Sequence, residues 1–267
     1  MPASPVVVSV PHAGRIYPPE LLAALRQPPR AVAALEDRHV DAVAQAAWTG
    51  ETMLVQQLGR AWIDLNRSEA ERDPRVDEGA PPAGATASAK LKSGLGLVPS
   101  RAGSGELWRR RFTDAEVTAR IEGDYRPYHR AVDAALDAAH ARFGVAVLFD
   151  LHSMPSLGRT GARVVIGDRF GRAAESRFVA RTEAVAAAWG HRAGVNTPYA
   201  GSHILDRHAR PAAGIHALQL ELDRTLYLDA RLDLPGPGLA ATAAMVRQML
   251  AALVDEALAG VAPLAAE

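Results

Sequence analysis

The chain has 267 residues, of which 48% are hydrophobic and 22% are charged, and its 30 basic residues balance its 30 acidic ones. A formal net charge of zero argues against a general nucleic-acid or membrane-surface binder, because such proteins need an excess of basic residues. There is no cysteine, which excludes disulfides, thiolate nucleophiles and cysteine-bound metals, so any metal site has to use His, Asp and Glu.

Membrane and export signals are not recognisable. Residues 1–10 lack the basic and apolar segments of a signal peptide, and no apolar run reaches the roughly 20 residues that a membrane span needs. We therefore expect a cytoplasmic protein with no membrane partner and no nucleic-acid partner.

The length suits one α/β unit and no internal repeat is found, so a single domain over residues 1–267 is predicted.

The first part of the chain predicts alternating strands and helices. The β-branched residues Val6, Val7 and Val8 predict a buried strand over 5–10, which Pro11 ends. Further elements are expected in this part of the chain: helices over residues 21–26 and 30–48, and strands over residues 51–57 and 60–65.

Residues 72–104 are rich in Gly, Pro, Ala and Ser and show little hydrophobic period. This composition predicts a long ordered loop or a lid. Thr113 is expected to cap the next helix, with Glu116 completing a capping box. That helix is predicted to run to Arg142, with Pro127 as the point where it can be interrupted.

The clearest strand is predicted over residues 145–151, where an apolar run ends in Asp150 and is followed by His152. Later elements follow the same alternation: a strand over 164–166, a helix over 173–189, a strand over 215–222 and a helix over 238–258. Strands that alternate with helices indicate an α/β sandwich around a mixed or largely parallel sheet.

Polar side chains follow several of these strands. They are His12, Asn66 with Arg67, His152 and Glu221. Ligand sites in open α/β sheets form at the ends of the strands, so these residues are the candidate site.

Two histidines and one carboxylate would form the three-ligand site that is typical of catalytic zinc. His12 and His152 supply the imidazoles, Asp150 can orient one of them, and the carboxylate can be Glu36, Asp37 or Asp41. The alternative is that the histidines are structural and that the acidic residues stabilise the first turn of a helix.

Arg67 can bind a carboxylate through two parallel hydrogen bonds. The alternative is a surface salt bridge with the nearby Glu69 or Glu71.

Glu221 shares a strand face with Gln219 and Asp223, and a carboxylate in that position can act as general base and then general acid toward a zinc-bound water. The alternative is a solvent-facing edge strand, which has the same alternation.

Together, several motifs resemble those of the N-formylglutamate amidohydrolase family, which is related to zinc carboxypeptidases and aspartoacylases. They occur in the family's order and cover nearly the whole chain: Ser-Val-Pro-His-Ala-Gly at 9–14, Glu-Asp-Arg-His-Val-Asp at 36–41, Asp-Leu-Asn-Arg at 64–67, Tyr-Arg-Pro-Tyr-His at 125–129, Asp-Leu-His-Ser-Met-Pro at 150–155 and Gln-Leu-Glu-Leu at 219–222.

The resemblance implies a three-layer α/β/α sandwich of the zinc-carboxypeptidase kind around a mixed, largely parallel sheet. It implies that His12 and His152 bind Zn²⁺ and that Glu221 is the general acid and base. It also implies that Arg67, with Asn66, holds a substrate carboxylate.

The chain departs from the related carboxypeptidases at one place and from the family that it resembles at another. Arg15 stands where the carboxypeptidase motif has a glutamate, so the third zinc ligand has to come from elsewhere, and Asp37 is predicted ahead of Glu36 and Asp41. Residues 201–208 differ from the family's Gly-Gly segment, which weakens the expectation that Arg207 contacts the substrate.

The expected function is zinc-dependent hydrolysis of N-formyl-L-glutamate, a small carboxylate-bearing molecule, to formate and L-glutamate. One alternative is a zinc hydrolase of another N-acyl amino acid or of a peptide. The other is a non-catalytic binding protein on the same scaffold. The sequence does not indicate an oligomeric state.

Overall fold

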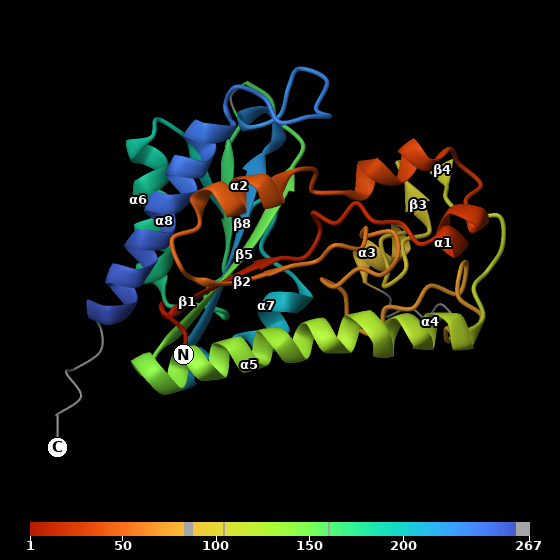
Figure 1. Ribbon diagram of the computed structural model, residues 1–267, viewed down its shortest axis with the longest axis horizontal. Coiled ribbons are helices and arrows are strands. Elements are labelled where there is room, and N and C mark those ends of the chain that lie inside the picture. The colour runs from red at the N-terminus through yellow and green to blue at the C-terminus, as the bar shows by residue number, and fades with distance from the viewer. Residues whose placement is uncertain (83–87, 104, 160, 260–267) are drawn as a thin grey trace. The chain divides into compact units, whose positions relative to one another are not determined.

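A computed structural model describes residues 1–82, 88–103, 105–159 and 161–259 (Figure 1). The chain forms two compact units. The first, which we call the sheet unit, comprises Met1–Val10, Arg38–Leu54 and Ala131–Glu267, and the second unit comprises Pro11–Asp37 and Val55–Arg130. One domain over the whole length stays a prediction.

A six-stranded mixed sheet forms the centre of the sheet unit, in the strand order β2-β1-β5-β8-β6-β7. The β1–β5, β5–β8 and β6–β7 pairs are parallel, and only β6–β8 is antiparallel among the pairs whose register is described. The strands are β1 (Val6–Val10), β2 (Thr52–Val55), β5 (Ala146–Met154), β6 (Val164–Gly167), β7 (Ala193–Val195) and β8 (Ile215–Asp223).

Helices cover the faces of this sheet, so the predicted α/β/α sandwich is confirmed. Helices α2 and α6 both pack against α8, and α7 contacts β5 and β8 (Figure 1). Their bounds are α2 (Val40–Ala47), α6 (Ser176–Ala188), α7 (His203–His208) and α8 (Leu239–Ala259), with short 3₁₀ helices η3 (Pro211–Ala213) and η4 (Arg224–Leu226).

Strands β5 and β8 are buried along their whole length. Their register pairs Asp150 with Gln219 and His152 with Glu221. Residues opposite each other in neighbouring strands point to the same face of the sheet. The carboxyl-terminal halves of the two central strands therefore share one polar face inside an otherwise apolar layer.

The second unit contains short helices, long connections and its own apolar core, which includes Leu97, Trp108, Phe112 and Tyr125. Its elements are α1 (Pro19–Ala24), η1 (Pro29–Leu35), α3 (Ala89–Lys92), the hairpin of β3 (Arg101–Ala102) and β4 (Gly105–Glu106), and α4 (Asp114–Arg120). A π-helical turn, η2 (Ile121–Tyr125), leads into α5 (Arg126–Phe143), which continues into the sheet unit.

The predicted capping box is confirmed. The Thr113 side chain accepts from the backbone of Glu116, whose carboxylate accepts from the backbone of Thr113. The expected interruption is a π-helical turn rather than a break: η2 ends two residues before Pro127 and continues directly into α5.

Two element predictions are wrong. The strand expected over 60–65 is a series of turns, because its backbone bonds locally and to another loop, as in the bond from Asp64 N to Leu97 O (2.7 Å). The helix expected over 30–48 is split into η1 and α2. Extended backbone at Glu36 and a left-handed His39 (φ 57°) separate the two pieces.

The segment 72–104 is largely irregular, as predicted, but it contains α3 and the start of the β3–β4 hairpin. Residues 83–87 and 104, which belong to this predicted loop, lie outside the described residues. Strand β7 and helix α7 are absent from the sequence-based prediction. Within the described ranges, no helix combines the length and the apolar character that crossing a bilayer requires.

Candidate functional site

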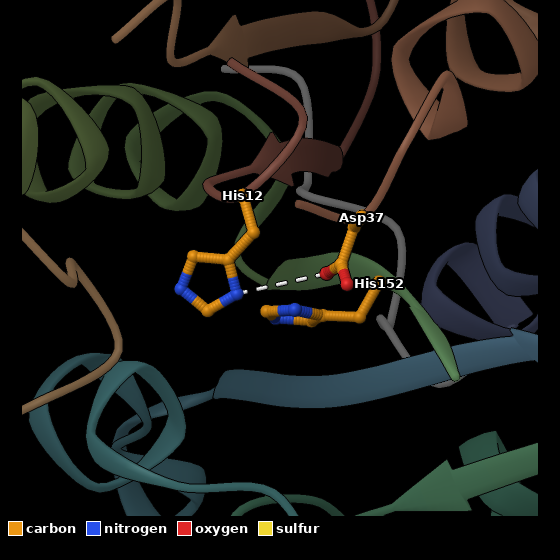
Figure 2. Close-up of side chains that lie close together, drawn as sticks. All are labelled: His12, Asp37 and His152. Carbon is orange, nitrogen blue, oxygen red and sulfur yellow. Dashed lines mark ion pairs between the residues drawn. The ribbon is translucent and has the colours of Figure 1, made fainter. Parts of the chain in front are cut away.

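The side chains of His12, Asp37 and His152 point toward one another (Figure 2). Each offers one ligand atom, and these three atoms all lie within 4.8 Å of one another. All three residues are buried, with exposed fractions of 2%, 3% and 3%. The group therefore has the spacing and the seclusion of a metal-binding site, and it includes Asp37 rather than Glu36 or Asp41.

Local structure explains how these residues meet. His12 follows β1 by two residues, and its carbonyl accepts a hydrogen bond from the backbone of Asp37 (2.9 Å). The extended break between η1 and α2 makes this bond possible. Gly14 is required at the next turn, because a Cβ there would lie 2.1 Å from the carbonyl oxygen of Leu58.

Each histidine contacts a buried aspartate through the same ring nitrogen. His12 Nε2 lies 2.8 Å from Asp64 Oδ1, and His152 Nε2 lies 2.8 Å from Asp150 Oδ2. Asp150 is held in turn by the Ser9 hydroxyl, which donates to its Oδ1 (2.7 Å). A carboxylate on one nitrogen fixes the tautomer and turns the other nitrogen, Nδ1, toward a metal.

The spacing between His12 and Asp37 fits a shared ion. His12 Nδ1 lies 3.6 Å from Asp37 Oδ2, which is too long for a hydrogen bond. Two ligand atoms at about 2.0–2.2 Å from one tetrahedral ion lie roughly 3.4 Å apart. Two imidazoles and a carboxylate suit zinc, and also iron, cobalt or nickel.

Asp64 contacts His12 of the candidate metal site and also two cationic side chains, Arg60 and Arg67. It accepts hydrogen bonds from the side chain of Arg60 (2.8 Å) and the backbone of Asn66 (2.9 Å), and Arg67 Nη2 lies 3.8 Å away. Burial acts to raise the pKa of Asp64, but Arg60, Arg67 and His12 more than offset burial and hold that pKa well below its usual range. The carboxylate therefore stays ionised and can accept a hydrogen bond from His12 Nε2.

The other two carboxylates proposed from the sequence have different surroundings. Glu36 is buried and accepts a hydrogen bond from the Tyr17 hydroxyl. Asp41 lies in the first turn of α2, where a negative charge favours the helix N-terminus.

Glu221 lies on the central strand β8, opposite His152 in register and on the same face. The edge-strand alternative is therefore wrong. The side chain is 8% exposed, and its Oε1 accepts from Gln219 Nε2 (2.9 Å). A buried carboxylate held one strand away from His152, a candidate metal ligand, is suitably placed for proton transfer.

Arg67 is 2% exposed, so it forms no surface salt bridge. Its guanidinium donates to the carbonyls of Leu95 (Nε, 2.7 Å) and Asn66 (Nη1, 2.5 Å). Its own carbonyl accepts from the Tyr125 hydroxyl (2.7 Å), whereas Glu69 pairs with Arg126. The side chain is thus a fixed, buried cation.

Arg207 lies on α7, where its side chain is 38% exposed and its Nη2 is 3.6 Å from Asp133 on α5. Its part in substrate binding stays a prediction.

Two further residues near the site are not among those predicted from the sequence. Asp64 belongs to the Asp-Leu-Asn-Arg motif, and an aspartate between two arginines at the end of an apolar run is a signal for a buried ion network. Arg224 follows β8 and donates from Nε to the hydroxyl of Ser153 (3.2 Å), the residue after His152. It places a further cation beside the polar face of the sheet.

Comparisons with known proteins point to one family. A model of the N-formylglutamate amidohydrolase family matches residues 4–228. The N-formylglutamate deformylases of Pseudomonas aeruginosa and Pseudomonas putida are 31% and 28% identical, each over 94% of this chain and 92% of the relative. The crystal structure of N-formylglutamate amidohydrolase from Ralstonia eutropha JMP134 superposes with a TM-score of 0.89 at 31% identity, covering 98% of this chain and 96% of that one.

Proposed function

The chain belongs to the N-formylglutamate amidohydrolase family, and from this premise we propose that it hydrolyses N-formyl-L-glutamate to formate and L-glutamate. The observation that carries the proposal is the buried convergence of His12, Asp37 and His152. Family membership supports the substrate, and the convergence supports a metal-dependent hydrolysis.

The ligands in this proposal are His12 and His152 through Nδ1 and Asp37 through a carboxylate oxygen. A zinc ion held by them supplies Lewis-acid activation of water and of the amide carbonyl. Asp64 and Asp150 keep the two imidazoles in the tautomer that such an ion requires.

Glu221 is the general base and then the general acid. It takes a proton from the water that attacks the formyl carbon, and a carbon–oxygen bond forms. It then gives that proton to the departing nitrogen as the carbon–nitrogen bond breaks. The hydrogen bond from Gln219 keeps the carboxylate in one orientation for both transfers.

Arg67, with Asn66, binds a carboxylate of the substrate, and Arg207 is a further candidate for that contact. The guanidinium of Arg67 is held by two carbonyls, so little side-chain entropy is lost when the substrate binds. A fixed carboxylate positions the amide for attack, which is the benefit of orientation.

Metal content and hydrolysis, measured on one preparation before and after chelation, test this proposal. We expect about one zinc per chain, as for a three-ligand catalytic site, loss of hydrolysis on chelation and recovery on addition of zinc. A substrate panel accompanies the test, with N-formylglutamate, N-acetylglutamate and a glutamate-containing dipeptide. N-formylglutamate should have the highest kcat/KM.

Two outcomes would contradict the proposal. Faster hydrolysis of the acetyl or peptide substrate would assign another acyl specificity. A metal-loaded preparation that hydrolyses none of the three would support a binding protein.

A further inference from the structure

The second unit contains a cavity of about 260 Å³ whose wall is dominated by arginine. None of the residues in the proposed active site lines it. Six arginines and one carboxylate do: Arg26, Arg75, Arg101, Arg109, Arg110, Arg111 and Glu106.

Three of these arginines are compensated by carboxylates. Arg26 pairs with Glu106 (3.0 Å), Arg75 pairs with Asp73 (2.7 Å), and Arg110 pairs with Glu116 (2.5 Å). Their charges are therefore largely balanced before any ligand binds.

The other three are not compensated in this way. In the part of the chain that the structure describes, no carboxylate lies within 4.0 Å of the guanidinium of Arg101, Arg109 or Arg111. Arg111 donates to a neutral acceptor, the carbonyl of Asp77 (2.8 Å). Three cations around one hollow repel one another, and a concave surface concentrates their field on whatever enters.

The backbone that carries these arginines is held in place. Arg26 N donates to Leu107 O (2.7 Å), and Arg109 N donates to Ala24 O (2.9 Å). Trp108, which lies between Leu107 and Arg109 in the sequence, is buried, and its indole donates to Pro99 O (2.7 Å). A wall fixed by such bonds needs little reordering when a ligand binds.

We propose that this cavity binds a small anion with two or three negative charges, carried by phosphate or carboxylate groups. The guanidinium fork matches both groups in geometry, and the exposed side chains of Arg101, Arg109 and Arg111 can turn to meet them. The volume of about 260 Å³ lies just below the range of ligand pockets, which run from about 300 to 1,000 Å³. It suits a compact metabolite rather than a nucleotide.

Isothermal titration calorimetry on the full chain tests the proposal, with inorganic pyrophosphate and tricarballylate as probes. The pocket variant is Arg101→Gln/Arg109→Gln, and the matched control is Arg130→Gln/Arg172→Gln, which removes the same charge from two other exposed positions. The wild-type protein and the control should bind at least one probe with equal affinity. The pocket variant should bind at least tenfold more weakly, and the tighter probe identifies the anionic group.

A pocket variant that melts like the wild-type protein and keeps its affinity would overturn the proposal, as would a wild-type protein that binds neither probe. If the double variant is unfolded, Arg109→Gln alone should still weaken binding, and its unchanged affinity would count against the cavity. Because these arginines lie outside the proposed active site, hydrolysis of N-formylglutamate by the pocket variant should match the wild-type rate. The two proposals can therefore fail separately.

Discussion

At the scale of single residues, the two imidazoles of the candidate metal site, formed by His12, Asp37 and His152, have matching surroundings. Both His12 and His152 face a buried aspartate through Nε2, at 2.8 Å in each case. An ionised carboxylate at this nitrogen makes the opposite nitrogen a better metal ligand. The affinity for a metal should therefore depend on residues that never touch it.

Replacing Asp64 by Asn should test that dependence. The amide is a weaker partner for His12 and removes a negative charge beside Arg60 and Arg67. We expect the affinity for zinc to fall about 10- to 100-fold, measured by competition with a chromophoric chelator. The matched control is Asp137→Asn, whose carboxylate is exposed and pairs only at the surface with Arg210. Equal zinc affinity in both variants would contradict the assigned role of Asp64.

Replacing Glu221 by Gln should separate proton transfer from metal binding. The side chain keeps its size and can still bond with Gln219, but it cannot accept a proton. We expect kcat to fall by about 10²- to 10⁴-fold while zinc content is unchanged. Glu183→Gln, an exposed position on α6, should leave both quantities at the wild-type value. Normal turnover in the Glu221 variant would exclude it as the general base.

At the scale of elements, the break between η1 and α2 is the feature that brings Asp37 into the candidate metal site. A continuous helix over residues 30–48 would keep the Asp37 backbone in helical hydrogen bonds. The observed extended segment instead lets Asp37 N reach the carbonyl of His12 (2.9 Å). Helical periodicity in the sequence did not reveal this break, because tertiary hydrogen bonds decide it.

The capping box at the start of α4 gives a prediction for stability. Thr113→Ala should lower the free energy of unfolding by about 1 kcal/mol, because the backbone of Glu116 loses its acceptor. Equilibrium unfolding in urea measures this change. Thr118→Ala, in the middle of the same helix, caps nothing and is the control. Equal stability of the two variants would mean that the cap contributes little in the folded chain.

The same cap should persist in acid. The hydrogen bond from Arg110 lowers the pKa of Glu116 to about 2, so the carboxylate stays ionised well below its usual range. The unfolded pKa lies near 4.3, so the stabilisation is complete above that pH and is lost as the pH falls toward 2.

At the scale of the whole molecule, buried histidines make stability depend on pH. Burial lowers the pKa of His216, which packs against Phe178 with ring centroids 4.6 Å apart, and Glu175 only partly opposes this. Burial also lowers the pKa of His208 against the opposing effect of Asp133. Both imidazoles therefore bind a proton less readily in the folded chain than in the unfolded chain.

The sign of the pH effect follows from these directions. In the window below the unfolded pKa of about 6.5, the unfolded chain binds more protons than the folded one, so the free energy of unfolding falls as the pH falls. Unfolding in urea at pH 7.5 and pH 5.5, in the presence of a chelator to remove metal effects, measures it. The His216→Leu variant should show a smaller difference between the two pH values. A wild-type chain with equal stability at both would refute the prediction.

Much of the architecture could be predicted from local patterns. The apolar run at residues 145–149 predicts β5, because a strand buried on both faces has a nearly continuous apolar sequence, and the alternation of apolar and polar residues over 215–222 predicts β8. The turns at 60–65 and the strand β7 were not predictable in this way. Residues 60–65 have the composition of a strand, but their backbone bonds to a loop. Strand β7 has only three residues and shows no clear alternation of apolar and polar side chains.

The sequence by itself determined the class of fold and which kinds of polar side chain follow the strands, because periodicity and residue type are local properties. Tertiary structure alone decided three further matters: that Asp37 rather than Glu36 or Asp41 joins the histidines, that Asp64 holds His12, and that Glu221 lies on a central strand. Each depends on which distant segments meet. Strand order and long-range hydrogen bonds set those meetings, and a pattern read along one stretch of chain does not contain them.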